Sequence, residues 1–150
     1  SFLYSLVMDT YSFGYSSSGF TDMPMNHKIF LAQFDAIKKL ASEGPCVMVG
    51  RCADYALSEY KDCFSVFVHA DTDWRINRLS QKHNKTAKEA KDMINKTDKS
   101  RSSYYNYYTN KKWGAASSYN LCVDSSKLGI DGAAKAIIQA IEIFDSIKNK

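Results

Sequence analysis

The sequence predicts an α/β protein in which a parallel sheet is flanked by helices in three layers. Three short apolar stretches are typical of buried strands, and segments with helical periodicity separate them. The predicted order is helix, strand, strand, helix, helix, strand, helix, which favours parallel strands. With 150 residues, 45% of them hydrophobic and 24% charged, residues 1–150 have the length and composition of a single domain with a real core.

The first 25 residues are rich in Ser, Tyr, Phe and Gly, and we expect a short helix near Ser1–Met8. The following "YSFGYSSSGFTDMP" has no helical or alternating period, so it predicts a loop. It is not a phosphate loop, because the Walker A pattern G-x-x-x-x-G-K-[ST] needs a lysine where Phe20 follows Gly19. The segment also lacks the basic start and the cleavage site of a signal peptide.

A helix is predicted from Asn26 to Ser42. Its apolar residues recur at spacings of three and four, at Ile29, Phe30, Phe34, Ile37, Leu40 and Ala41. Asn26 can cap the start, and Gly44-Pro45 ends the helix. The next four residues, Cys46–Val49, are all apolar, as expected for a strand covered on both faces. The first strand is therefore predicted there.

The middle of the chain continues the alternation. A second strand is predicted at about Phe64–His69, followed by a helix that Asp71 or Thr72 caps. Thr86 and Glu89 match a capping box, which predicts the start of a second, largely polar helix.

A third strand at Leu121–Val123 and a closing helix at about Ile130–Ile147 complete the predicted domain. Ligands of open parallel sheets bind at the carboxyl ends of the strands. Polar groups follow each predicted strand, at Gly50-Arg51, His69-Ala70-Asp71 and Asp124-Ser125-Ser126.

Arg51 is the strongest single candidate for a ligand contact. A guanidinium at the end of a strand is carried by a rigid element and can offer two parallel hydrogen bonds to a phosphate or a base edge. Gly50 before it lets the chain turn or a ligand approach the backbone. The alternative is a structural role, in which Arg51 pairs with a nearby acid such as Asp54.

Residues 97–114, "TDKSRSSYYNYYTNKKWG", combine basic and aromatic side chains. Three interpretations stay open: tyrosines that pack along a helix, a basic lid that closes over a phosphorylated ligand, and a single-stranded nucleic-acid surface. The four tyrosines within Tyr104–Tyr108 cannot all face one side of a helix, so some are exposed or meet a partner. Upstream, Arg75 and Arg78 lie one turn apart on a predicted helix.

Composition narrows the class of protein. The net charge of +4 suits an anionic small ligand, and it is too small for a strong nucleic-acid footprint. No apolar run approaches the roughly 18 residues of a membrane span. The four cysteines form no C-x-x-C pair, which favours a reduced, cytoplasmic protein without a zinc or other metal site.

Four segments in this order resemble the cytidylate-kinase-like proteins of bacteria, relatives of cytidylate kinase among the P-loop nucleoside monophosphate kinases. They are "CVMVGRCADYAL", "FSVFVHADTDWRINRL", "DKSRSSYYNYYTNKKWG" and "YNLCVDSSKLGI". The resemblance covers about residues 24–145. It implies a five-stranded parallel sheet of P-loop kinase type, with a mobile helical lid that corresponds to residues 84–114. The family's phosphate loop would precede residue 1.

The resemblance implies an acceptor-binding role for Arg51, which matches the arginine of the family's strand-end Gly-Arg-Asp motif. The sequence departs from that motif, because Cys52 follows the arginine and the acid comes later, as Asp54, which is the second predicted acceptor-binding residue. The acceptor is therefore not restricted to CMP in our prediction.

The resemblance also implies roles for the two helices between the second and third strands. Arg75 and Arg78 match an arginine-bearing helix on the donor side of the lid. Asp98, Lys99 and Arg101 match the charged lid motif that contacts the acceptor and the transferring phosphate, and they are the predicted catalytic residues.

We expect phosphoryl transfer from Mg²⁺·ATP to CMP, dCMP or a related small phosphorylated acceptor. The alternative is a non-catalytic nucleotide-binding protein on the same fold. The expected partner is a small nucleotide rather than a membrane or a nucleic acid. A homo-oligomer is a further expectation, because residues 1–25 are apolar and otherwise unexplained.

Overall fold

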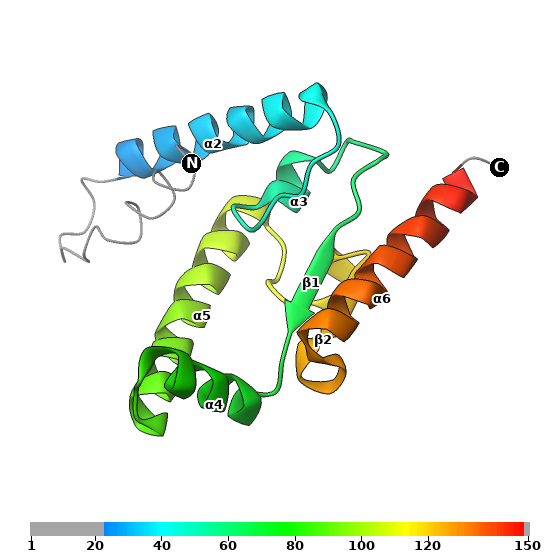
Figure 1. Ribbon diagram of the computed structural model, residues 1–150. Helices are drawn as coiled ribbons and strands as arrows, with labels where there is room; N and C mark the ends of the chain where they lie inside the picture. The colour runs from blue at the N-terminus through cyan, green and yellow to red at the C-terminus, as the bar shows by residue number, and fades with distance from the viewer. Residues whose placement is uncertain (1–22, 149–150) are drawn as a thin grey trace. The chain divides into compact units, whose positions relative to one another are not determined.

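The computed structural model describes residues 23–148, with side chains from Ile29 onward (Figure 1). The chain divides into two compact units, residues 1–36 and 37–150, and each is described by itself. The short helix expected at Ser1–Met8 lies outside the described residues. In chain order the elements are α2 (Met23–Glu43), α3 (Ala53–Ala56), β1 (Val66–His69), α4 (Thr72–His83), α5 (Ala87–Thr109), the 3₁₀ helix η1 (Ala116–Ser118), β2 (Leu121–Asp124) and α6 (Ser125–Lys148).

Helix α2 begins in the first unit and continues into the second, and it confirms the first predicted helix with a start three residues earlier. Phe30 is buried, and its ring centroid lies 5.9 Å from that of Phe34, one turn further along. Gly44, with a φ of 147°, follows the last helical residue. Pro45 then prevents the helix from resuming, because its ring clashes with the preceding turn and it has no N–H to donate.

The two strands β1 and β2 confirm the predicted second and third strands and their parallel direction. Val66 pairs with Leu121 at one end and His69 with Asp124 at the other. Parallel strands need a long connection, because the chain must return to the end at which the first strand began. Residues 70–120, with α4, α5 and η1, form that connection.

Helix α6 covers one side of this small sheet (Figure 1). Val123 of β2 and Ala133 of α6 are both buried, and the rings of Phe64 and Phe144 lie 5.2 Å apart. Gly129 has a φ of 69° and interrupts the helix after its first turn. The main part therefore starts at the predicted position, and the polar residues directly after β2 form a separate short turn.

Helices α4 and α5 form a hairpin with well-defined ends. The Asp71 carboxylate accepts hydrogen bonds from the backbone N–H groups of Asp73 and Trp74, at 2.9 and 3.4 Å, and so caps α4. Asn84 ends α4 in a left-handed conformation that asparagine tolerates better than most residues.

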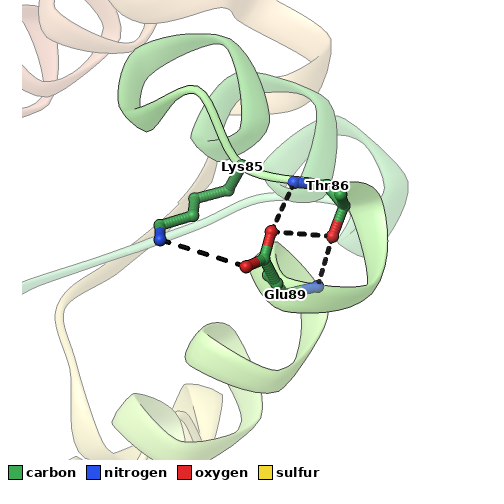
Figure 2. Close-up of polar contacts among 3 residues, drawn as sticks. All are labelled: Lys85, Thr86 and Glu89. Carbon is green, nitrogen blue, oxygen red and sulfur yellow. Dashed lines mark hydrogen bonds and ion pairs between the residues drawn. The ribbon is translucent and has the colours of Figure 1, made fainter.

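Figure 2 shows the start of α5, where the predicted capping box is confirmed. The Thr86 hydroxyl accepts a hydrogen bond from the Glu89 N–H, at 3.3 Å. In return, the Glu89 carboxylate accepts from the Thr86 N–H and hydroxyl, both at 2.8 Å. The hydrogen bonds from Thr86 lower the pKa of Glu89, and Lys85 at 4.0 Å adds to this. The local sequence alone therefore predicts the residue at which helix α5 starts.

The prediction of a strand at Cys46–Val49 is wrong, because these residues have no strand pairing. Val47 and Val49 are 94% and 90% exposed. Apolar content makes a segment suitable for a buried strand, but only a neighbouring backbone turns it into one. Among the described residues, no segment pairs with it.

The layered sheet of the sequence-based expectation is also not formed within residues 23–148. What the described chain holds is a mixed α/β structure, with a two-stranded parallel sheet and mostly helices. None of the helices in this part of the chain combines the length and the apolar composition that a membrane span requires.

We expect Thr86→Ala to lower the free energy of unfolding by about 1 kcal/mol, because it removes the side-chain cap of a 23-residue helix. Urea denaturation followed by circular dichroism would measure the change. Ser103→Ala, at an exposed position of the same helix, is the matched control and should stay within about 0.5 kcal/mol of the parent chain. Equal effects of the two substitutions would contradict the assignment of Thr86 as the cap of α5.

Candidate functional site

Arg51 lies in a turn of left-handed backbone that leads into helix α3. Gly50, Arg51 and Cys52 have φ angles of 72°, 55° and 56°. This conformation costs a residue with a side chain roughly 1–2 kcal/mol, so it persists only where other contacts hold it. The Ala53 N–H donates to the Gly50 carbonyl at 3.1 Å, and the Ala56 N–H donates to the Cys52 carbonyl at 2.9 Å. The turn thereby fixes where Arg51 leaves the backbone.

The residues after Arg51 form a small buried cluster. Its members are Cys52, Ala53, Ala56 and Leu57, each less than 9% exposed. Burial, and then the Asp54 carboxylate, raise the pKa of the Cys52 thiol to about 12, while the Arg51 charge opposes the rise. The thiol is therefore protonated at neutral pH, so it packs in the buried cluster and does not act as a nucleophile.

Asp54, the predicted acceptor-binding acid, is bonded to helix α5. The Tyr105 hydroxyl donates to Asp54 Oδ2 at 2.7 Å. Tyr105 is only 6% exposed, and its own carbonyl accepts from the Thr109 hydroxyl at 2.7 Å. Burial, and then the hydrogen bond to Asp54, hold the pKa of Tyr105 well above its usual range. The Tyr105 hydroxyl therefore stays protonated throughout the physiological pH range and remains a hydrogen-bond donor to Asp54.

Tyr104 approaches the same turn from the neighbouring position on α5. Burial and the nearby Cys52 raise the pKa of Tyr104 to about 12, and the charge of Arg51, together with its hydrogen bond to Tyr104, opposes this rise. The ring of Tyr108 lies 4.8 Å from that of Tyr104, whereas Tyr107 is 63% exposed. The expectation that the tyrosines cannot all face one side is thus confirmed, and two of them reach the Arg51 turn.

An aromatic cluster connects Tyr105 with strand β1. Tyr119 stacks between Tyr105 and Phe67, at ring distances of 6.1 and 5.0 Å, and Trp113 meets Phe67 edge-on at 5.3 Å. Gly114 lies against this cluster with a φ of 75°, and a Cβ atom there would come within 3.2 Å of the Phe67 ring. Tyr105 and Trp113, two of the aromatic residues of the 97–114 segment, therefore pack in the cluster on β1.

Two further predicted site residues bind each other. The Arg75 guanidinium contacts the Asp98 carboxylate through both of its terminal nitrogens, at 2.7 and 2.9 Å. Both side chains are about two-thirds buried, so the pair is better shielded from water than an ordinary surface ion pair. The bond joins α4 to α5.

The side chain of Arg78 makes a different contact from that of Arg75. Its guanidinium lies over the Trp74 ring, 5.4 Å from the centroid, in a cation–π contact. Together with Gln81 and Lys82 it lines an open surface hollow.

Lys99 and Arg101, the remaining predicted site residues, are exposed on α5. Arg101 follows Asp98 by three positions and precedes Tyr105 by four, so the three lie on the same side of the helix. Lys99 points elsewhere, since one residue is a turn of about 100°. The geometry therefore places Arg101, but not Lys99, between the contact with α4 and the contact with α3.

The polar residues after β1 and β2 are engaged with one another. The Ser126 N–H and hydroxyl both donate to Asp124 Oδ1, and the Asp71 N–H donates to the Ser126 hydroxyl at 3.1 Å. The Ser125 hydroxyl donates to the His69 carbonyl at 3.0 Å. The hydrogen bonds from Ser126 lower the pKa of Asp124. These groups tie the strand ends together.

The predicted site residues thus fall into two groups, Arg51 with Asp54 and Arg75 with Asp98, and Arg101 lies between them along α5. Sequence reasoning missed Tyr104 and Tyr105 as the partners of the first group. A signal was present: Tyr105 continues the buried stripe that runs along α5 through Ala90, Ile94 and Thr109.

Comparisons with known proteins agree with the resemblance found in the sequence. The sequence model of the cytidylate kinase-like family matches residues 1–127. A crystal structure of an uncharacterized protein from Eubacterium ventriosum is similar, with 34% sequence identity and a TM-score of 0.75 over 78% of this chain and 74% of that one. No curated protein matches.

The buried tyrosines predict a loss of stability at alkaline pH. The unfolded chain releases tyrosine protons near pH 10, whereas the folded chain keeps those of Tyr104 and Tyr105. The two tyrosines contribute their full stabilisation of the fold below pH 10, and this contribution is lost as the pH rises through their pKa values in the folded chain. We expect Tyr105→Phe to reduce this fall in unfolding free energy by up to about 1.4 kcal/mol per pH unit above pH 10.

Urea denaturation at intervals between pH 8 and 11 would measure this dependence. Tyr107→Phe, which removes an exposed hydroxyl from the same helix, is the control. If both variants keep the pH dependence of the parent chain, the buried hydrogen bond does not contribute to it.

Proposed function

The chain belongs to the cytidylate kinase-like family, and we propose on that basis that it transfers the γ-phosphoryl group of ATP to a nucleoside monophosphate or a related small phosphorylated acceptor. CMP and dCMP are the first candidates for the acceptor. The match to the family over residues 1–127 carries the proposal. The arrangement of the arginines supports it, because phosphoryl transfer requires mainly positioning and positive charge around the phosphate oxygens.

Arg51 would hold the acceptor in this proposal. Its turn is closed by backbone hydrogen bonds and backed by buried Cys52 and Ala53, and the Arg51 side chain is hydrogen-bonded to Tyr104, so the guanidinium is positioned before a ligand arrives. A guanidinium prepared in this way loses little side-chain entropy when it binds a phosphate. Cys52 supplies no covalent chemistry, because its thiol stays protonated at neutral pH.

Helix α5 would bring the remaining charges to the reaction. Arg101 is exposed between the two contacts of this helix, where it could approach a transferring phosphate. Asp98 would act by holding Arg75, and thereby α4, in place. We assign Arg78 to the donor side, with its guanidinium directed by Trp74. Lys99 lies on a different side of α5 from Arg101. Its predicted catalytic role therefore requires α5 to rotate or the long lysine side chain to reach around the helix.

Mg²⁺·ATP would be the phosphoryl donor. The described residues place no group of three or more His, Cys, Asp or Glu side chains where it could hold a metal ion, and Asp98 is already bound to Arg75. The 150 residues also contain no Walker A sequence. We therefore derive no step through Mg²⁺; bound with ATP, the ion would neutralise charge on the phosphates.

As part of the same proposal, the family's layered sheet of P-loop kinase type applies to this protein, and residues 84–114 act as a lid. We also propose a cytoplasmic location, with which the cysteines of the described chain, all free thiols, are consistent.

The direct test is an assay of ADP formation from ATP with CMP, dCMP, UMP, AMP and GMP as acceptors. We expect turnover with at least one pyrimidine monophosphate. Nucleotide binding without turnover of any acceptor would favour the non-catalytic alternative, and the absence of both would contradict the proposal.

Two substitutions then test the assigned roles. Arg51→Ala should raise the KM for the acceptor roughly 10–100-fold and leave the KM for ATP nearly unchanged, because it removes a charge-assisted hydrogen bond on one side only. Arg101→Ala should lower kcat with little loss of stability. Lys91→Ala, which removes an exposed cation from the same helix, is the control. A similar loss for both substrates in Arg51→Ala would show that the residue is wrongly placed.

A further inference from the structure

The turn that carries Arg51 is not self-supporting. Arg51 and Cys52 both adopt left-handed backbone, and the helix that follows has only the four residues Ala53–Ala56. So short a helix is unstable in isolation, because too few hydrogen bonds offset the cost of ordering it. The conformation of the turn therefore depends on side-chain contacts with the rest of the unit.

One such contact is polar and comes from a distant part of the chain. Asp54, three residues after Arg51, accepts a hydrogen bond from the Tyr105 hydroxyl at 2.7 Å. Asp54 lies within α3 itself, so fixing its carboxylate fixes the short helix and the turn before it. This hydrogen bond connects residues 51 positions apart.

Tyr105 is itself held firmly. Its side chain is 6% exposed, its ring stacks on Tyr119, and Thr109 bonds to its carbonyl. The Tyr119 hydroxyl, which accepts from the Gly114 N–H at 3.5 Å, also contacts Tyr105. The anchor thus belongs to the packed aromatic cluster on strand β1 and does not need a ligand to form.

We propose that Asp54 and Tyr105 are positioning residues, whose hydrogen bond holds the left-handed turn and so presents Arg51. Resting on the proposed function, this assigns Asp54 to the turn rather than to the base of the acceptor. The neighbouring residue Cys52 is buried and uncharged, so it offers the base no carboxylate either. The chain would then recognise its acceptor mainly through the phosphate that Arg51 binds, with weak discrimination between bases.

The first test follows the turn without any ligand. Three amide protons report on it, because the N–H groups of Ala53, Ala56 and Leu57 are hydrogen-bonded within the turn and α3. Asp54→Ala and Tyr105→Phe should accelerate their hydrogen exchange roughly tenfold or more, relative to amides of the β1–β2 pair. Asp54→Asn should preserve slow exchange, since its amide oxygen can still accept from Tyr105.

Tyr107→Phe is the matched control for the tyrosine substitution and should leave exchange unchanged. Uniform acceleration across the chain, or no difference between Asp54→Ala and the parent, would overturn the positioning role. The pair of Asp54 variants keeps this test decisive even if Tyr105→Phe proves unstable.

The second test asks whether Asp54 reads the base. Affinities of the chain and its variants are measured by calorimetric titration with CMP, UMP and ribose 5-phosphate, which has no base. Asp54→Ala should weaken all three by a similar factor, and Asp54→Asn should match the parent. A selective loss of CMP affinity in Asp54→Asn would overturn the inference. If the parent binds none of the three but exchange responds as expected, the pyrimidine-acceptor part of the proposed function fails and the positioning role stands.

Discussion

The parallel pairing of β1 with β2 is the constraint from which the rest of the second unit follows. The pairing aligns Val66 with Leu121 and His69 with Asp124, so the chain has to leave one end of the sheet and return to the other. Residues 70–120 make that return as a helical hairpin. The same pairing brings the polar strand ends together, where Ser125 and Ser126 tie them with hydrogen bonds.

Within that connection, helix α5 sets the distances between the candidate site residues. Asp98 holds Arg75 of α4 at one point, and Tyr105 holds Asp54 of α3 at another, seven residues further on. A helix rises 1.5 Å per residue, so these points are about 10 Å apart along its axis. Arg101 lies between them on the same side. A rigid helix with two fixed contacts can thus hold cations from three separate segments at a constant spacing.

The chemistry that this arrangement favours is electrostatic rather than covalent. The thiol of Cys52 and the hydroxyls of Tyr104 and Tyr105 all keep their protons, because burial raises their pKa values. None of these three groups therefore acts as a nucleophile or a base at neutral pH. The tyrosines instead act as donors and packing surfaces, which suits a site whose task is to hold a phosphorylated ligand in place.

The sequence by itself determined the elements whose signals are local. The capping box at Thr86 and the periodicity of α2 and α6 depend on neighbours along the chain, so their positions could be predicted. The family resemblance was likewise legible from four short segments. Arg51 could be identified as a candidate from its place after an apolar run.

Only the tertiary structure decided what those elements meet. The apolar run Cys46–Val49 has the composition of a strand but no pairing among the described residues, because pairing needs a second backbone that composition cannot supply. Asp54 and Asp98 look alike in the sequence, yet one accepts from a tyrosine and the other binds an arginine. These partners lie 51 and 23 residues away, and no local pattern records such distances, since only the folded chain brings them within hydrogen-bonding range.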